Sequence, residues 1–251
     1  RAYRFWRIGR TGSALSRREI DKERGVVVEE WRRGRGAGAR LRDQQLPVIL
    51  RGSRYAQRLP IGERAVLDTF AHRALIDFYQ RWYRPGLMAL IAVGDFDPDW
   101  VEERIQTHFS QIAASESPEA RPLYPVPDHE QTLFAIAADP EATHSSATVY
   151  YKRDVEPEGR VGDYRRYLVQ ALYHRMLNQR LDELTMQADP PYLQAVSTQG
   201  RMVRSKEAYM LRAVVADNGV ERGLEAILQE ARRVLVHGFT ATELAREKKG
   251  M

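Results

Sequence analysis

The sequence contains no cysteine at all. This absence excludes a disulfide-stapled scaffold, thiol catalysis and metal sites built from thiolates. There is also no run of eighteen or more apolar residues, so no segment is predicted to span a membrane. The first residues hold no apolar stretch of the kind that a signal peptide needs.

Lysine is scarce as well, with five lysines against 34 arginines in a chain whose formal net charge is +5. Residues 1–42 hold 13 basic and 5 acidic side chains, and the remaining residues sum to −3. The basic end leaves a nucleic-acid-binding module as one hypothesis, which predicts tight and steeply salt-dependent binding. The Arg/Gly stretch at 32–40 is short and occurs once, without the many repeats of an RNA-binding tract, which favours a loop or a helix end. We therefore expect no nucleic-acid partner.

A chain of 251 residues, 43% of them hydrophobic, is long enough to bury one large core or two ordinary ones. Residues 113–129 carry four prolines and no helical or strand periodicity, a composition typical of an extended connector. We predict a first domain over 1–112, a connector over 113–129 and a second domain over 130–251. Because the chain starts at Arg1 without an initiator methionine, we expect it to be a piece of a longer protein.

The part before the connector alternates helix, strand and helix. Ser16 and Glu19 form the pattern of a capping box, and apolar residues at helical spacing precede Pro85. We expect a helix from Ser16 past Trp31, a helix over 75–82, a strand over 87–93 and a helix over 98–109 capped by Asp97.

The part after the connector has more strands. We expect strands over 132–138 and 146–151, a helix over 164–184, strands over 192–203 and 207–216 joined by a turn at 204–206, a helix capped by Asp217 or Asn218, and a last helix opened by the capping box Thr240–Glu243. The two parts together predict an α+β fold with antiparallel-rich sheets and helices packed on one face.

Two carboxylates of the first helix, Glu23 and Glu30, are the best candidates for chemistry. They lie seven residues apart, so about 20° separates them around a helix. The wheel places them beside Val26 and Val27, which predicts that they emerge from the apolar stripe. A buried carboxylate costs several kcal/mol unless a cation or strong donors meet it, so a metal or an arginine is expected nearby. Pairing with arginines, or a helix that is only half buried, stays open as an alternative.

The segment D-K-E-R-G-V-V-V-E-E-W at 21–31 resembles the part of the insulinase/pitrilysin zinc metallopeptidases that carries their distal metal ligand. The resemblance continues in order through four further segments: R-L-P-I-G at 58–62, F-Y-Q-R-W-Y-R-P at 78–85, M-A-L-I-A-V-G-D-F-D at 88–97 and G-F-T-A-T-E-L at 238–244. Each motif alone is weak, but their order and spacing together are specific.

This resemblance implies two αβ domains of the insulinase/processing-peptidase type, the first incomplete and the second non-catalytic. It implies Glu30 as the distal zinc ligand and Glu23 as a residue that supports the site from just outside. The family's H-x-x-E-H motif supplies two histidine ligands and a glutamate base. No histidine pair here has that spacing, so we expect no catalytic residue in this chain, no zinc held by it alone and no activity of its own. Residues 1–16 also depart from the family, because arginines interrupt what is usually a more apolar helix.

The parent protein is expected to be a zinc metalloendopeptidase acting on peptides or unfolded proteins, completed by the missing peptidase half or by a partner subunit. A degenerate, non-catalytic member that serves as a structural or interaction domain is the alternative. The family favours the periplasm or cell envelope, and the cytoplasm stays open. A calcium loop at 95–99 is not expected, because Pro98 lies inside it and Trp100 stands where such a loop needs glycine.

Overall fold

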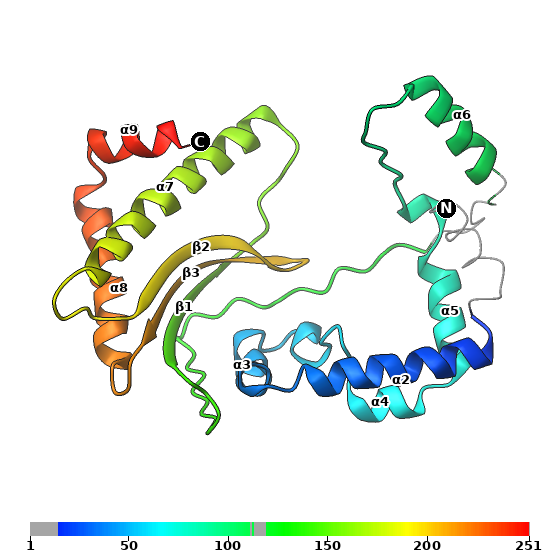
Figure 1. Cartoon of the computed structure of the whole chain (residues 1–251), viewed down its shortest axis with the longest axis horizontal. Coiled ribbons are helices and arrows are strands. Elements are labelled where there is room, and N and C mark those ends of the chain that lie inside the picture. Colours follow the sequence, from blue (N-terminus) through cyan, green and yellow to red (C-terminus); the bar gives the residue numbers. More distant parts are fainter. Residues whose placement is uncertain (1–14, 111, 113–118, 251) are drawn as a thin grey trace. The chain divides into compact units, whose positions relative to one another are not determined.

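The structure, a computed structural model, describes residues 15–110, 112 and 119–250, and Figure 1 shows the chain. The predicted departure at 1–16 lies almost wholly outside these residues, as does 113–118 of the connector. The elements are α2 (Arg17–Arg33), α3 (Ala37–Ile49), η1 (Arg54–Gln57), α4 (Arg64–Thr69), α5 (His72–Trp82), η2 (Pro85–Leu87), α6 (Pro98–Phe109), β1 (Ser145–Arg153), α7 (Val161–Thr185), β2 (Gln194–Val203), β3 (Lys206–Val215), α8 (Val220–His237) and α9 (Ala241–Lys249).

Two compact units divide the chain. Unit 1 comprises residues 1–36 and 58–122, and unit 2 comprises residues 37–57 and 123–251. Helix α3 therefore packs with the second half of the chain, although it follows α2 directly in the sequence. The predicted domain division at 113–129 stays a prediction.

Unit 1 is built around the long helix α2, which begins where its cap predicts. The Ser16 hydroxyl accepts a hydrogen bond from the Glu19 amide at 3.3 Å. Helix α4 packs along α2, and Arg24 joins the two. Its guanidinium donates to the carbonyls of Leu67 (2.5 Å) and Phe70 (2.9 Å) and lies over the Phe70 ring. Arg24 thus satisfies carbonyls at the end of α4 that have no partner inside that helix.

Helices α5 and α6 confirm the predictions made for them, and the Asp97 carboxylate caps α6 by accepting from two backbone amides. The strand predicted over 87–93 is wrong: after η2 the backbone has no regular structure. Ile91 and Val93 are 84% and 90% exposed. A strand needs a neighbour to pair its backbone, and no other strand occurs among the described residues of this unit. Helix α4 was not predicted, because six residues give too short a pattern.

Unit 2 contains a three-stranded antiparallel sheet in the order β1-β3-β2. Strands β2 and β3 form the predicted hairpin, and Tyr151, Tyr209 and Gln199 lie in one cross-strand row. Helices α7 and α8 both cover one face of this sheet (Figure 1). The core between these layers holds the fully buried Leu177, Leu181, Leu211 and Ile227.

The start of α8 differs from the prediction. Its N-cap is Gly219, not Asp217 or Asn218, and no side chain caps it. Asn218 takes a left-handed conformation with φ 61°, which turns the chain out of β3. A Cβ at Gly219 would lie 3.1 Å from the Ala216 carbonyl oxygen and 3.2 Å from the Val215 Cβ, so a larger residue there would require these neighbours to shift by a few tenths of an ångström.

The strand predicted over 132–138 is also wrong, and Phe134 and Ile136 are strongly exposed there. Just before it, the second half of the proline-rich stretch packs onto the sheet end. Val126 is buried, and the buried Lys206 pairs with Asp128 at 2.6 Å and Asp154 at 2.8 Å. The alternating apolar residues at 132–138 therefore form no strand, whereas residues of the proline-rich stretch contact the sheet, and the sequence pattern alone does not distinguish these two outcomes.

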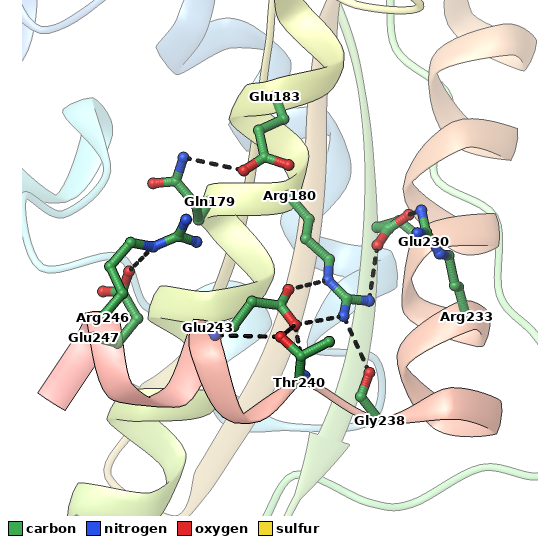
Figure 2. A network of polar contacts seen from close by, with 10 residues as sticks. All are labelled: Gln179, Arg180, Glu183, Glu230, Arg233, Gly238, Thr240, Glu243, Arg246 and Glu247. Carbon is green, nitrogen blue, oxygen red and sulfur yellow. Dashed lines mark hydrogen bonds and ion pairs between the residues drawn. The ribbon is translucent and has the colours of Figure 1, made fainter.

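One arginine of α7 ties three helices together (Figure 2). Arg180 makes two hydrogen bonds to the Glu243 carboxylate, at 2.5 and 3.0 Å, and one to Glu230 at 3.3 Å. It also donates to the Gly238 carbonyl at 3.1 Å. Thr240 completes the capping box of α9, because its backbone N–H and its hydroxyl donate to Glu243 at 2.7 and 2.8 Å. The cluster fixes the start of α9 against α7 and α8.

The same contacts make the stability of unit 2 depend on pH, with a loss of stability in acid. Arg180 is the main cause that lowers the pKa of Glu243 from 4.5 to about 2, with hydrogen bonds from Thr240 adding to it. A depressed carboxyl pKa stabilises the fold fully above the unfolded value and loses that contribution as the pH falls from about 4.5 towards 2. We expect about 1–2 kcal/mol less stability at pH 3 than at pH 6 from this group, after solvent screening.

Urea unfolding at the two pH values measures this loss. Glu243→Gln is expected to reduce the difference between the two free energies of unfolding. Glu225→Gln, at a carboxylate on the outer side of α8 that accepts only from Gln229, serves as the matched control. An equal acid dependence in Glu243→Gln and in the control contradicts the prediction.

Candidate metal centre

Glu23 and Glu30 both lie on α2, and both side chains are exposed. The buried side of this helix holds Ile20, which is 3% exposed, while Val26 is 54% exposed. The expectation that the two carboxylates emerge from a buried apolar stripe is therefore wrong: they lie on its border, facing solvent. The half-buried helix left open as an alternative describes α2 better.

Neither carboxylate is paired with an arginine of the described residues. Within the described part of the chain, Glu23 and Glu30 make no side-chain hydrogen bond or ion pair. Their neighbour Glu29, in contrast, pairs with Arg32 at 2.9 Å on the same helix. The two candidate residues thus present free carboxylate oxygens on one side of α2.

These donors do not make a zinc site by themselves. Zinc in proteins takes three or four ligands in tetrahedral geometry, and imidazole is common among them. No group of three or more His, Cys, Asp or Glu side chains that could hold a metal ion occurs among the described residues. His72 lies near α2, but its Nε2 is 2.7 Å from the Asp21 carboxylate and not beside Glu23. The chain's own residues therefore supply part of a ligand set, and no catalytic step can be derived within it.

The start of α2 has a counterpart at the start of α9, which our sequence analysis missed. Shifted by 224 positions, S-R-R-E-I-D-K-E-R at 16–24 matches T-A-T-E-L-A-R-E-K at 240–248. Both helices begin with a hydroxyl that accepts from the amide three residues later, at 3.3 Å and 3.2 Å. Comparing the two capping boxes, rather than reading each as a separate helix start, would have revealed the repeat.

The counterpart shows what surrounds such carboxylates when a helix packs across them. Glu247 corresponds to Glu23, and Arg175 of α7 donates to it at 3.0 Å. Glu243 corresponds to Glu19 and is held by Arg180. In unit 2 the carboxylates of this pattern are thus neutralised by arginines from α7. Glu23 of unit 1 has no equivalent partner within the described residues.

Comparison with known sequences matches most of the chain. The sequence model described as "Peptidase M16 inactive domain" matches residues 69–251, a range that leaves out α2. The chain is 39% identical over 179 residues to the "zinc protease PQQL-like" of Arabidopsis thaliana, which is 71% of this chain and 19% of that protein. It is 29% identical over 230 residues to the "probable zinc protease PqqL" of Escherichia coli, which is 90% of this chain and 24% of that protein. It therefore spans about a quarter or less of these relatives.

Solved structures agree with the sequence matches. The first half of the periplasmic protease PqqL from Escherichia coli superposes with a TM-score of 0.81 and 26% identity, over 94% of this chain and 50% of that one. The ferredoxin protease FusC, solved in complex with Arabidopsis ferredoxin, has a TM-score of 0.75 over 94% of this chain and 26% of that one. At 24% identity, this second likeness shows the fold alone.

These matches confirm the predicted α+β class and the resemblance that the motifs carry. Among the described residues, no helix combines the length and the apolar character needed to cross a membrane. The proteins that match are zinc proteases by name, and the structural neighbours include an insulinase-family protease from Yersinia pestis. The chain belongs to the M16 peptidases, the insulinase/pitrilysin family of zinc proteases.

Proposed function

We propose that this chain is part of a zinc metalloendopeptidase that hydrolyses peptide bonds in peptides or unfolded proteins. The observation that carries the proposal is the pair of exposed carboxylates, Glu23 and Glu30, on one side of α2 in a chain of this family. Two exposed carboxylates that have no partner among the described residues leave oxygen donors available to a cation.

In this proposal Glu30 is the distal zinc ligand and Glu23 supports the site from just outside. Bound zinc supplies Lewis-acid polarisation of the scissile carbonyl and of the attacking water. The role of α2 is to hold the two carboxylates in place, and Arg24, about 100–120° around the helix from them, keeps α2 on α4 through its bonds to Leu67 and Phe70. The imidazole ligands and the general base would come from an H-x-x-E-H segment, which these 251 residues lack.

The internal counterpart supports this arrangement. In unit 2, α7 packs across α9 and meets its carboxylates with Arg175 and Arg180. By analogy, a helix carrying H-x-x-E-H would pack across the start of α2 beside Glu23, and the site would extend along the same side of α2 to Glu30, which lies outside the matched range. One half of the repeat would then hold a metal, and the other half would hold ion pairs.

The 251-residue chain alone is predicted to be inactive, because one distal carboxylate ligand holds zinc weakly and no general base accompanies it. A fluorescence-quenched unfolded peptide, incubated with the purified chain and added zinc, measures cleavage. We expect a rate equal to that of the Glu30→Gln variant, which reports contaminating proteases. Zinc-dependent, chelator-sensitive cleavage that disappears in Glu30→Gln contradicts the prediction.

A non-catalytic parent is the second candidate, because the model that matches residues 69–251 is that of an inactive domain and leaves out α2, so the match shows no active site. In that case the chain would serve as a structural or interaction domain. The coding sequence immediately upstream of Arg1 distinguishes the two. An H-x-x-E-H motif there supports the peptidase, and its absence supports the non-catalytic candidate.

The partners follow from the same proposal. The substrate would be a peptide or an unfolded protein, and a missing peptidase half or a partner subunit would complete the site. The periplasm or cell envelope is the proposed location, supported by the relative from Escherichia coli that is named as periplasmic. The cytoplasm is the alternative.

A further inference from the structure

Unit 2 contains a pocket of about 480 Å³ between its sheet and α7. Tyr151 and Tyr209 of the sheet and Val169, Tyr173 and His174 of α7 line it. The volume lies within the range of small-ligand sites in proteins, roughly 300–1,000 Å³. Neither Glu23 nor Glu30 contributes to it, so it is separate from the candidate metal ligands.

The lining is an assembled cluster of rings. The hydroxyls of Tyr173 and Tyr209 are 3.1 Å apart and share a hydrogen bond. The Tyr173 and His174 rings meet edge to face with centroids 5.2 Å apart, and Tyr151 lies 5.9 Å from Tyr209. Edge-to-face and offset contacts are the arrangements that aromatic rings prefer. Because the rings already hold one another, a ligand does not have to order them, which lowers the cost of binding.

The polar side chains around the pocket have hydrogen-bond partners: the Lys152 ammonium donates to the Ile49 carbonyl at 2.9 Å, and Gln170 donates to Glu156 at 3.1 Å. Arg153 is ion-paired with Glu156 and donates to the Gln199 side chain at 3.3 Å. His174 shares a hydrogen bond with the Ser197 hydroxyl at 2.8 Å, and burial lowers the pKa of His174. The imidazole is therefore neutral at neutral pH. A charged group entering this largely aromatic pocket would lose bound water, and a cation would also meet Lys152 and Arg153 of the lining, whereas an uncharged ring carries neither cost.

The mouth of the pocket is apolar and accessible. Tyr151 and Val169 are 54% and 52% exposed, so an entering side chain would cover apolar surface on both sides of the opening. We infer that this pocket binds an aromatic or large apolar side chain of an unfolded peptide. The proposal shares only the class of ligand with the proposed function and needs neither zinc nor cleavage.

Titration of the 251-residue chain with N-acetyl-L-phenylalaninamide tests the inference, with the Val169 methyl resonances as the NMR signal. We expect saturable shifts of these resonances. The matching aspartate and lysine derivatives are expected to bind at least about tenfold more weakly. No saturation by the phenylalanine probe, or equal binding of all three, overturns the inference.

Two matched variants locate the site. Val169→Glu places a carboxylate in the pocket wall and is expected to weaken phenylalanine binding about tenfold. Val161→Glu makes the same change in the first turn of α7, outside the pocket, and is expected to bind like the original chain. In both variants, binding is measured by the shifts of the Tyr151 and Tyr209 ring resonances. Thermal unfolding checks that both variants are folded. Equal weakening in the two variants overturns the proposal, and neither outcome bears on Glu30, since no metal enters the measurement.

Discussion

Replacing Arg180 by methionine is expected to lower the free energy of unfolding of unit 2 by about 3 kcal/mol. The Arg180 and Glu230 side chains are 13% and 6% exposed, so water reaches this ion pair poorly. Methionine keeps the aliphatic stem but leaves Glu230 and Glu243 without their main cation. Removing one partner from a buried pair costs about 3–5 kcal/mol, because a charge remains buried and uncompensated. Urea unfolding followed by circular dichroism measures the change.

Arg175 provides the matched control on the same helix. It pairs with Glu247, but its side chain is 45% exposed, and exposed pairs contribute less than about 1 kcal/mol. We expect Arg175→Met to cost no more than that. The double variant Arg180→Met with Glu230→Gln should regain part of the lost stability, since it removes one of the stranded charges. Equal effects of Arg175→Met and Arg180→Met would show that burial does not control these ion pairs.

The second large effect concerns Glu30 in the parent protein proposed above. Glu30→Gln is expected to lower kcat/KM for an unfolded peptide more than about 100-fold, because a ligand is lost outright. Glu23→Gln should cost about 10–100-fold, the range typical of residues that support metal ligands from outside. Steady-state cleavage of a quenched fluorescent peptide at saturating zinc measures both.

Glu29→Gln is the control for these two variants. Glu29 lies next to Glu30 on α2 and is exposed, but it pairs with Arg32 and points away from the Glu23 side. We expect its kcat/KM to stay within about twofold of the unmodified protein, as surface substitutions usually do. A kcat/KM of Glu30→Gln equal to that of the unmodified protein would show that Glu30 is not part of the site, whatever the kcat/KM of Glu23→Gln.

The sequence predicted the elements whose signals are local. Ser16, Asp97 and Thr240 each have a side chain that can satisfy free amides, and each begins a helix in the structure. The β2–β3 hairpin followed from alternating apolar residues on both sides of a polar turn. These features depend on residues that lie close together in the chain.

The errors arose where the outcome depends on distant residues. The segments 87–93 and 132–138 carry strand patterns, but no strand within the described residues pairs with either of them. Glu23 and Glu30 share a side of α2 as their spacing requires, yet the helix is tied to the end of α4 by hydrogen bonds of the charged Arg24. Helical spacing fixes which residues are neighbours on a helix, and it does not fix how deeply the neighbouring elements bury them.

Zinc stoichiometry of the purified parent protein tests the central claim most directly. Elemental analysis after extensive dialysis should find one zinc per chain in the unmodified protein and in Glu29→Gln, and much less than one in Glu30→Gln. Full zinc occupancy in Glu30→Gln, or no zinc in the unmodified protein, would contradict the assignment of Glu30 as a metal ligand.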